Sequence, residues 1–211
     1  MRVGTGGFLA LAALLVLAGC AGMETKTAPI AGAENIVVDA PTYKVGDEWR
    51  YTGGVFSQVI GFEGDLHITA SNRDRFCQGC RYLLDRNGTV VKTLDAQGNP
   101  TQSATQGLKF LDFPLRVGKT WSQDIDLRQT STGAMRPYSN TWKVEAYEEI
   151  TVKAGTFKAF RIGWHQENRG PYGWSGDATF WWSPDVKAAV KSIAHTSDWF
   201  RPWELESYTL K

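Results

Sequence analysis

Short runs of apolar, β-branched and aromatic residues, separated by turn-forming residues, are the dominant pattern from about residue 48 to the end of the chain. No stretch after the N-terminal segment has the length and 3.6-residue period of a helix, so the pattern predicts antiparallel all-β structure. The predicted strands cover residues 48–52, 56–61, 65–70, 81–85, 89–94, 120–127, 140–146, 148–152, 157–165, 177–183, 188–195 and 204–210.

Turn signals divide these strands at short intervals. Asn87-Gly88 between two apolar runs is a two-residue hairpin signal. Further breaks fall at Gln97–Pro100, Lys153–Gly155 and Ser183–Asp185. Strands joined in this way predict either an antiparallel half-barrel or a two-sheet β-sandwich over residues 43–211.

One short motif occurs twice. Val45–Trp49 and Val117–Trp121 share the pattern V-G-x-x-W, in which a glycine turn leads into a strand that opens with tryptophan. One interpretation is a pair of related β-meander halves, and the other is two unrelated strand starts.

Strand periodicity separates two adjacent tryptophans. Side chains alternate along a strand, so Trp182 should share the core face with Phe180, and Trp181 should lie on the opposite, polar face with Asp177 and Thr179. Further core predictions are Trp49, Trp121, Phe160, Ile162 and Trp164.

The first residues are typical of a bacterial export signal. A short basic start precedes the apolar run Phe8–Leu17, which is too short for the roughly 20 residues of a membrane-spanning helix. The following Leu17–Cys20, LAGC, resembles a lipobox. The resemblance implies a signal peptide over residues 1–19, cleavage before Cys20 and lipid attachment to its sulfur, which palmitate labelling would detect.

The segment after Cys20 predicts a flexible tether over residues 20–42, because it is rich in Ala, Gly, Thr and Pro. Position 21 is alanine rather than the aspartate that retains enterobacterial lipoproteins in the inner membrane. We therefore expect attachment to the outer membrane, with the domain in the periplasm. Without residues 1–19 the chain has equal numbers of basic and acidic residues, so charge indicates no nucleic-acid partner.

The last third of the chain resembles a family of uncharacterised exported bacterial β-proteins that includes lipoproteins. The similarity rests on the motif order AGTF-x-A at 154–159, FWW-SP-x-V at 180–186 and EL-x-SY at 204–208. It implies an antiparallel half-barrel or sandwich and assigns no catalytic residue.

Cys77 and Cys80 frame a Gln-Gly pair that suits the centre of a hairpin. Facing residues of a hairpin are close enough for a disulfide, and export places the pair in an oxidising compartment. A redox motif would need a helix after the first cysteine, and a zinc site would need two more ligands. We favour a structural disulfide, with no metal and no cofactor.

Enzyme signatures are weak, so a non-catalytic protein is the expected class. Gly173–Asp177 departs from the nucleophile motif G-x-S-x-G at its last position. A triad of Ser175, His165 and Asp177 is left open, and a serine beside His165 or His195 would favour a hydrolase.

Two aromatic loops flank the strands at 177–183 and 188–195. If these strands form a hairpin, both loops emerge from the end away from its turn. The candidate contact residues are Tyr172, Trp174, Trp199, Phe200 and Trp203, with Trp181 as a further candidate. The cluster is either a binding mouth for a ligand or partner, or a plug that closes the end of the sheet.

The expected function is therefore non-catalytic binding by a membrane-anchored lipoprotein of the cell envelope. The ligand is a lipid or other hydrophobic molecule, or an envelope partner. The alternatives are a structural or assembly subunit, and a hydrolase acting on envelope material. An apolar cavity lined by residues such as Trp182 would favour a lipid carrier.

The cysteine pair gives a first prediction. Thiol counting on the unfolded, unreduced protein should detect no free thiol from Cys77 and Cys80, and the protein should stay folded after reduction, because closing so short a loop contributes little stability. Loss of a metal together with unfolding on chelation would contradict this prediction.

Overall fold

The computed structural model describes residues 27–52, 56–62, 65–70, 81–85, 87–104, 107–129, 132–171, 173–194 and 202–211. These residues form strands throughout, apart from one turn of 3-10 helix, η1 (Ala33–Asn35). The strands are β1 (Thr27–Pro29), β2 (Glu48–Tyr51), β3 (Phe56–Phe62), β4 (Asp65–Ala70), β5 (Arg81–Leu84), β6 (Thr89–Leu94), β7 (Pro100–Ala104), β8 (Leu108–Lys109), β9 (Thr120–Gln129), β10 (Met135–Val152), β11 (Gly155–Asn168), β12 (Ser175–Ser183), β13 (Ala188–Ala194) and β14 (Trp203–Thr209). The prediction of an antiparallel all-β fold is confirmed.

The strands are arranged as two six-stranded meanders. In the first, β2 to β7 pair in sequence order, and in the second, β9 to β14 do the same. The last strand of each meander pairs with the first strand of the other, β7 with β9 and β14 with β2. Of the two interpretations of the repeated V-G-x-x-W motif, this arrangement matches two meander halves, each opened by one copy of the motif.

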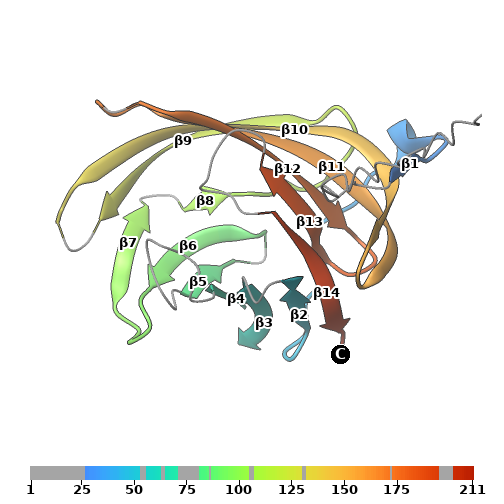
Figure 1. The fold of residues 1–211 in the computed structure, drawn as a ribbon, viewed down its shortest axis with the longest axis horizontal. Coiled ribbons are helices and arrows are strands. Elements are labelled where there is room, and N and C mark those ends of the chain that lie inside the picture. The colour runs from blue at the N-terminus through green and yellow to red at the C-terminus, as the bar shows by residue number, and fades with distance from the viewer. Residues whose placement is uncertain are drawn as a thin grey trace, which may run out of the picture.

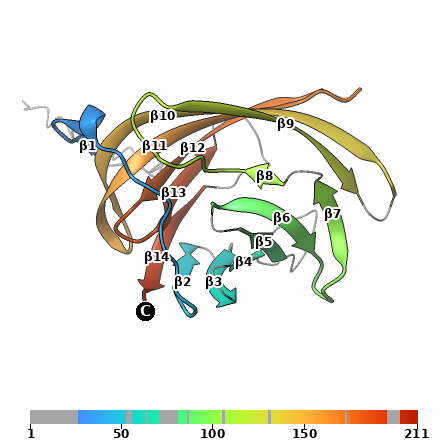
Figure 2. The ribbon, with the colours of Figure 1, turned by 180° about the vertical axis from the view of Figure 1, so that it is seen from behind.

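The two meanders form layers of different size. The long strands β9–β12 make a curved layer above the short strands β2–β7, and β13 and β14 descend from it towards β2 (Figure 1). From behind, the N-terminal segment and the connection between β8 and β9 run along one side of the β11–β13 region (Figure 2). The longer second half therefore has material packed on both sides.

The buried face of β11 changes along the strand, from one hydrophobic cluster to another. Phe157 and Ala159 pack in a cluster with side chains of β2, β3, β5, β13 and β14. Phe160, Ile162 and Trp164 pack in a second cluster with β10, β12 and the connection between β8 and β9. Since side chains alternate between the two faces of a strand, one face of β11 is buried at Phe157 and Ala159 and the other from Phe160 onwards, while Lys158 and His165 on the opposite faces are exposed.

Residues before the predicted domain boundary near Tyr43 already pack on the domain. Residues Thr27–Pro29 already pair with Glu148–Ile150 of β10, and Val38 exchanges two backbone hydrogen bonds with Leu115. Ile30 and Ile36 pack against the second cluster. Spaced apolar residues in this segment thus cover part of the domain. Within the described residues, no helix is long and apolar enough to cross a membrane.

Strands β7 and β8 were not predicted, because neither carries an alternating apolar pattern. Each is fixed by its partners instead. Gln102 of β7 pairs with both β6 and β9, and Leu108–Lys109 pairs with Thr89–Val90 of β6. Pairing with neighbouring strands, and not the local sequence pattern, therefore determines where β7 and β8 lie.

The two V-G-x-x-W turns have the same backbone hydrogen bonds. Gly46 N donates to Ile60 O, Ile60 N to Asp47 O and Asp47 N to Lys44 O. The corresponding donors and acceptors in the second turn are Gly118 N to Val144 O, Val144 N to Lys119 O and Lys119 N to Arg116 O. Both glycines have positive φ, 90° and 82°, which favours glycine at this position of each turn.

Three tryptophans stack across neighbouring strands. Trp121 of β9, Trp142 of β10 and Trp164 of β11 are paired in register, and their rings are nearly parallel with centroids 5.7 and 6.1 Å apart. Trp164 Nε1 donates to Asn140 Oδ1 at 3.1 Å. The Nε1–H of Trp142, in contrast, is buried and has no acceptor among the described residues.

This difference predicts unequal costs for two similar substitutions. Trp164→Phe removes a buried hydrogen bond, whereas Trp142→Phe removes a donor that has no acceptor. We expect Trp164→Phe to lose about 1–2 kcal/mol more unfolding free energy than Trp142→Phe. Urea denaturation of both variants would measure the difference, and equal losses would show that ring volume alone sets the cost.

Candidate functional site

The aromatic residues predicted to form one cluster are only partly described. Tyr172, Trp199 and Phe200 lie outside the described residues. The hairpin on which the prediction depended is present, because β12 and β13 pair around the turn at 184–187. Trp174 therefore lies at the end of β12 away from that turn, where its ring contacts Tyr138 with centroids 6.1 Å apart.

Trp203 lies elsewhere in the fold. It pairs with Ser192, which faces Phe180, six residues along β12 from Trp174. At about 3.3 Å per residue, that spacing separates the two positions by roughly 20 Å. The ring of Trp203 packs edge-on against Tyr51, 4.8 Å between centroids, at the border of the first hydrophobic cluster. Trp174 and Trp203 therefore do not form one rim.

Trp181 lies on the face of β12 that carries Asp177 and Thr179, as predicted, but it is buried, so its selection as a candidate contact residue is wrong. It is 3% exposed and Trp182 is 2% exposed, with Trp181 in the first cluster and Trp182 in the second. The alternation along β12 is as predicted, but the prediction assumed that only one face of the strand was covered. Trp181 Nε1 donates to Glu148 Oε1 at 2.8 Å, which satisfies a carboxylate that is itself buried.

A row of charged residues crosses the sheet beside Trp181. Arg161 of β11, Trp181 of β12 and Lys191 of β13 occupy successive paired positions. Arg161 binds Glu145 at 3.1 Å and Glu148 at 3.3 Å, and Lys191 lies 3.8 Å from Glu204 of β14. Buried charges need such partners, so these ion pairs hold the strands in register rather than forming an open site.

His165 and Asp177 form an exposed pair on the same face of the sheet. His165 Nδ1 hydrogen-bonds Asp177 Oδ1 at 2.8 Å, and both side chains are about half exposed. They line a shallow pocket of about 330 Å³ together with Thr141, Lys143, Glu145, Gly163 and Thr179. A Cβ at Gly163 would come within 2.8 Å of Glu145 Oε1, so this glycine makes room for the carboxylate.

This pocket has the residues of a polar binding site. Among the described residues, the side-chain hydrogen bond of His165 is to Asp177, its register partner on β12, and Ser175 lies two residues away from Asp177, opposite Glu167 of β11. No group of three or more His, Cys, Asp or Glu side chains in the described structure is arranged to hold a metal ion. His195 lies outside the described residues. Within the described part of the chain, the side-chain contact of His165 is thus with a carboxylate and not with a serine.

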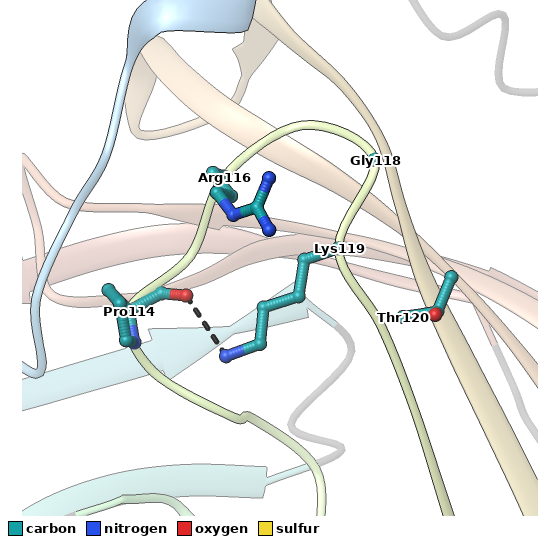
Figure 3. Close-up of a pocket in the computed structure, with 5 residues that line it drawn as sticks. All are labelled: Pro114, Arg116, Gly118, Lys119 and Thr120. Carbon is teal, nitrogen blue, oxygen red and sulfur yellow. Dashed lines mark hydrogen bonds between the residues drawn. The ribbon is translucent and has the colours of Figure 1, made fainter.

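A second pocket, of about 460 Å³, lies beside the Gly118 turn. It is lined by Pro114, Arg116, Gly118, Lys119 and Thr120 (Figure 3). Lys119 Nζ donates to Pro114 O at 3.0 Å and to Asp112 O, and lies 2.9 Å from Asp112 Oδ2. Burial raises the pKa of Asp112, but Lys119 and Lys109 lower it by more, so its pKa is below the ordinary value. Arg116 is exposed.

The Gly46 turn carries a buried carboxylate where the Gly118 turn carries Lys119. Asp47 is fully buried and accepts hydrogen bonds from Lys44 N at 2.9 Å, Lys211 N at 2.8 Å and Lys187 Nζ at 3.4 Å. Burial raises the pKa of Asp47, but the N–H groups of Lys211 and Lys44 and the charge of Lys187 lower it by more. The net pKa is therefore below the ordinary aspartate value.

Sequence reasoning missed the pocket residues Arg116 and Lys119. The V-G-x-x-W repeat did mark this turn, but we interpreted it only as a structural repeat. Cys20, Cys77 and Cys80 lie outside the described residues, so lipid attachment and the disulfide stay predictions.

Comparison with known proteins found similarity only to solved structures; no protein-family model and no curated protein matches the sequence. One is the hypothetical lipoprotein YmcC from Escherichia coli K12, with 14% identity and a TM-score of 0.47 over 83% of this chain and 91% of that chain. Another, from Parabacteroides distasonis and likewise described as a lipoprotein, has 13% identity and a TM-score of 0.47 over 82% of this chain and 100% of that chain. TM-scores below 0.5 at such identities establish no shared function.

Asp47 predicts a pH-dependent loss of stability on substitution. In Asp47→Asn, one acceptor oxygen is replaced by a donor that faces other donors, so the variant should unfold more easily at neutral pH. Because the folded-state pKa is depressed, the wild-type contribution is complete above the ordinary aspartate pKa of about 4 and is lost as the pH falls further. The difference in unfolding free energy between Asp47→Asn and the wild type should therefore shrink below about pH 4.

Denaturation of both proteins at several pH values would test this, with Asp39→Asn, a substitution at an exposed aspartate, as the control. A pH-independent difference would rule out the carboxylate as its source.

Proposed function

We propose that this chain is a bacterial lipoprotein, attached to a membrane through Cys20, whose β domain has a non-catalytic binding role at the cell envelope. The anchor is supported by the apolar run Phe8–Leu17 followed by LAGC. The observation that carries the proposal is the position of β1, which joins the domain only seven residues after Cys20.

The docking of β1 shortens the expected tether. If residues up to 42 were flexible, the domain would be free to move far from its anchor. With Thr27 paired to Ile150, seven residues link lipid and domain and span at most about 25 Å when fully extended. Membrane attachment and the fold are therefore coupled, and the β1 side of the domain stays near the lipid surface.

The pockets favour a polar ligand or an envelope partner over a carried acyl chain. Charged and hydroxyl side chains line both of the pockets described above, including Lys143, His165, Arg116 and Lys119. Trp182, the residue expected to line a lipid cavity, packs edge-on against Phe113 with centroids 5.2 Å apart. Space at Trp182 is thus taken by the protein's own side chains.

We further propose outer-membrane attachment with the domain in the periplasm, on the basis of Ala21. A structural or assembly role at the envelope is the second candidate, favoured by the long strands β9–β11, whose many pairings leave little of the layer free to move.

Replacement of the anchor residue tests the proposal. Cys20→Ser should abolish incorporation of radiolabelled palmitate and leave the precursor unprocessed, because the thiol is the acyl acceptor. The control is Cys77→Ser combined with Cys80→Ser, which should incorporate palmitate like the wild type. Equal labelling of the Cys20→Ser variant and the wild type would refute lipid attachment at Cys20.

A further inference from the structure

The two V-G-x-x-W turns differ in what covers their glycine. A Cβ placed on Gly46 would meet the Lys211 side chain, with Cε at 3.3 Å and Cγ at 3.4 Å. A Cβ placed on Gly118 would meet no atom within 4 Å. Because both turns have the same backbone hydrogen bonds, the same position is filled by a chain segment in one half and opens into the 460 Å³ pocket in the other.

The charge at this position is reversed between the halves. The residue after the glycine is Asp47 in the first turn and Lys119 in the second, and the residue two before the glycine is Lys44 or Arg116. In the first turn, the carboxylate of Asp47 holds the group that covers Gly46, since it accepts a hydrogen bond from Lys211 N at 2.8 Å. The second turn presents donors and positive charge in place of this acceptor.

Arg116 is the group available to a ligand. Lys119 Nζ already has Pro114 O, Asp112 O and Asp112 Oδ2 as acceptors, so it contributes charge more than hydrogen bonds. The described chain places no carboxylate within salt-bridge distance of Arg116, and Figure 3 shows its side chain extending into the pocket beside Lys119. The local net charge is positive, because three basic residues, Lys109, Arg116 and Lys119, lie here with one acidic residue, Asp112.

We propose that the pocket beside Gly118 is a binding site for an anionic group, a carboxylate or a phosphate, which Arg116 holds with paired hydrogen bonds and which Lys119 attracts by its charge. The planar guanidinium matches both oxyanions in a two-bond geometry. This proposal rests on the proposed binding role and names the chemical class of the ligand. Lipid headgroups and partner carboxylates are both sources of such a group, and the Val38–Leu115 hydrogen bonds keep the site beside the N-terminal segment that leads to Cys20.

The matching turns provide an internal control for the test. The full chain, ¹⁵N-labelled and held in micelles of a neutral detergent, is titrated with inorganic phosphate or acetate at constant ionic strength. The backbone N–H resonances of Gly118 and Lys119 should shift and saturate, whereas those of Gly46 and Asp47 should stay in place. Arg116→Gln should raise the dissociation constant roughly tenfold or more, because a charged hydrogen-bond donor is lost.

Lys44→Gln is the matched control variant, because it removes the same charge at the equivalent position of the first turn and should leave anion binding unchanged. Absence of saturation, equal shifts in both turns or unchanged affinity in Arg116→Gln would each overturn the proposal.

The preferred oxyanion is the one, phosphate or acetate, that binds with the lower dissociation constant. Phosphatidylglycerol in the micelles, in place of phosphate, distinguishes a lipid headgroup from a free ion. The mass of the protein in the same sample shows whether it is acylated. Absence of lipid attachment is therefore distinguished from absence of anion binding.

Discussion

The change of buried face along β11 is the constraint on which the rest of the structure depends. Phe157 and Ala159 enter one hydrophobic cluster from one face, and Phe160, Ile162 and Trp164 enter another from the opposite face, so different segments must cover the two parts of the strand. The first meander and β13–β14 cover one face. The N-terminal segment and the connection between β8 and β9 cover the other. Ile30 and Ile36 of the N-terminal segment contribute to this second cover, and the segment is held by the pairing of Thr27–Pro29 with β10.

The same burial explains the polar groups inside the fold. A carboxylate or amide surrounded by tryptophans is costly unless its hydrogen bonds are made. Glu148 has Trp181 and Arg161 as partners, and Asn140 has Trp164 and Gln166. Trp142 is the exception, with a buried N–H that has no acceptor. These contacts fix the register of neighbouring strands, which apolar packing alone specifies less sharply.

With the interior occupied by side chains, the candidate sites lie at the surface. One surrounds His165 and Asp177, where Gly163 leaves space on the sheet. The other lies beside the Gly118 turn, and comparison with the equivalent Gly46 turn explains why it is open. In the first half the buried carboxylate of Asp47 holds Lys211, two residues after the end of β14, over the turn. In the second half the reversed charge leaves an open, positively charged pocket.

The sequence by itself determined the all-β class, ten of the strand positions to within a few residues and the hairpin turns, because turn residues and strand periodicity are local properties. The repeated V-G-x-x-W motif left two halves as one of two interpretations, and the strand pairing decided between them. Only the tertiary structure decided that Trp181 is buried, that β7 and β8 are strands and that the N-terminal segment packs on the domain. Each of these depends on a partner distant in sequence, and alternation along one strand cannot tell whether its second face is covered. The pocket at Arg116 and Lys119 was likewise beyond the sequence, because the repeated motif located the turn but not what lies above its glycine.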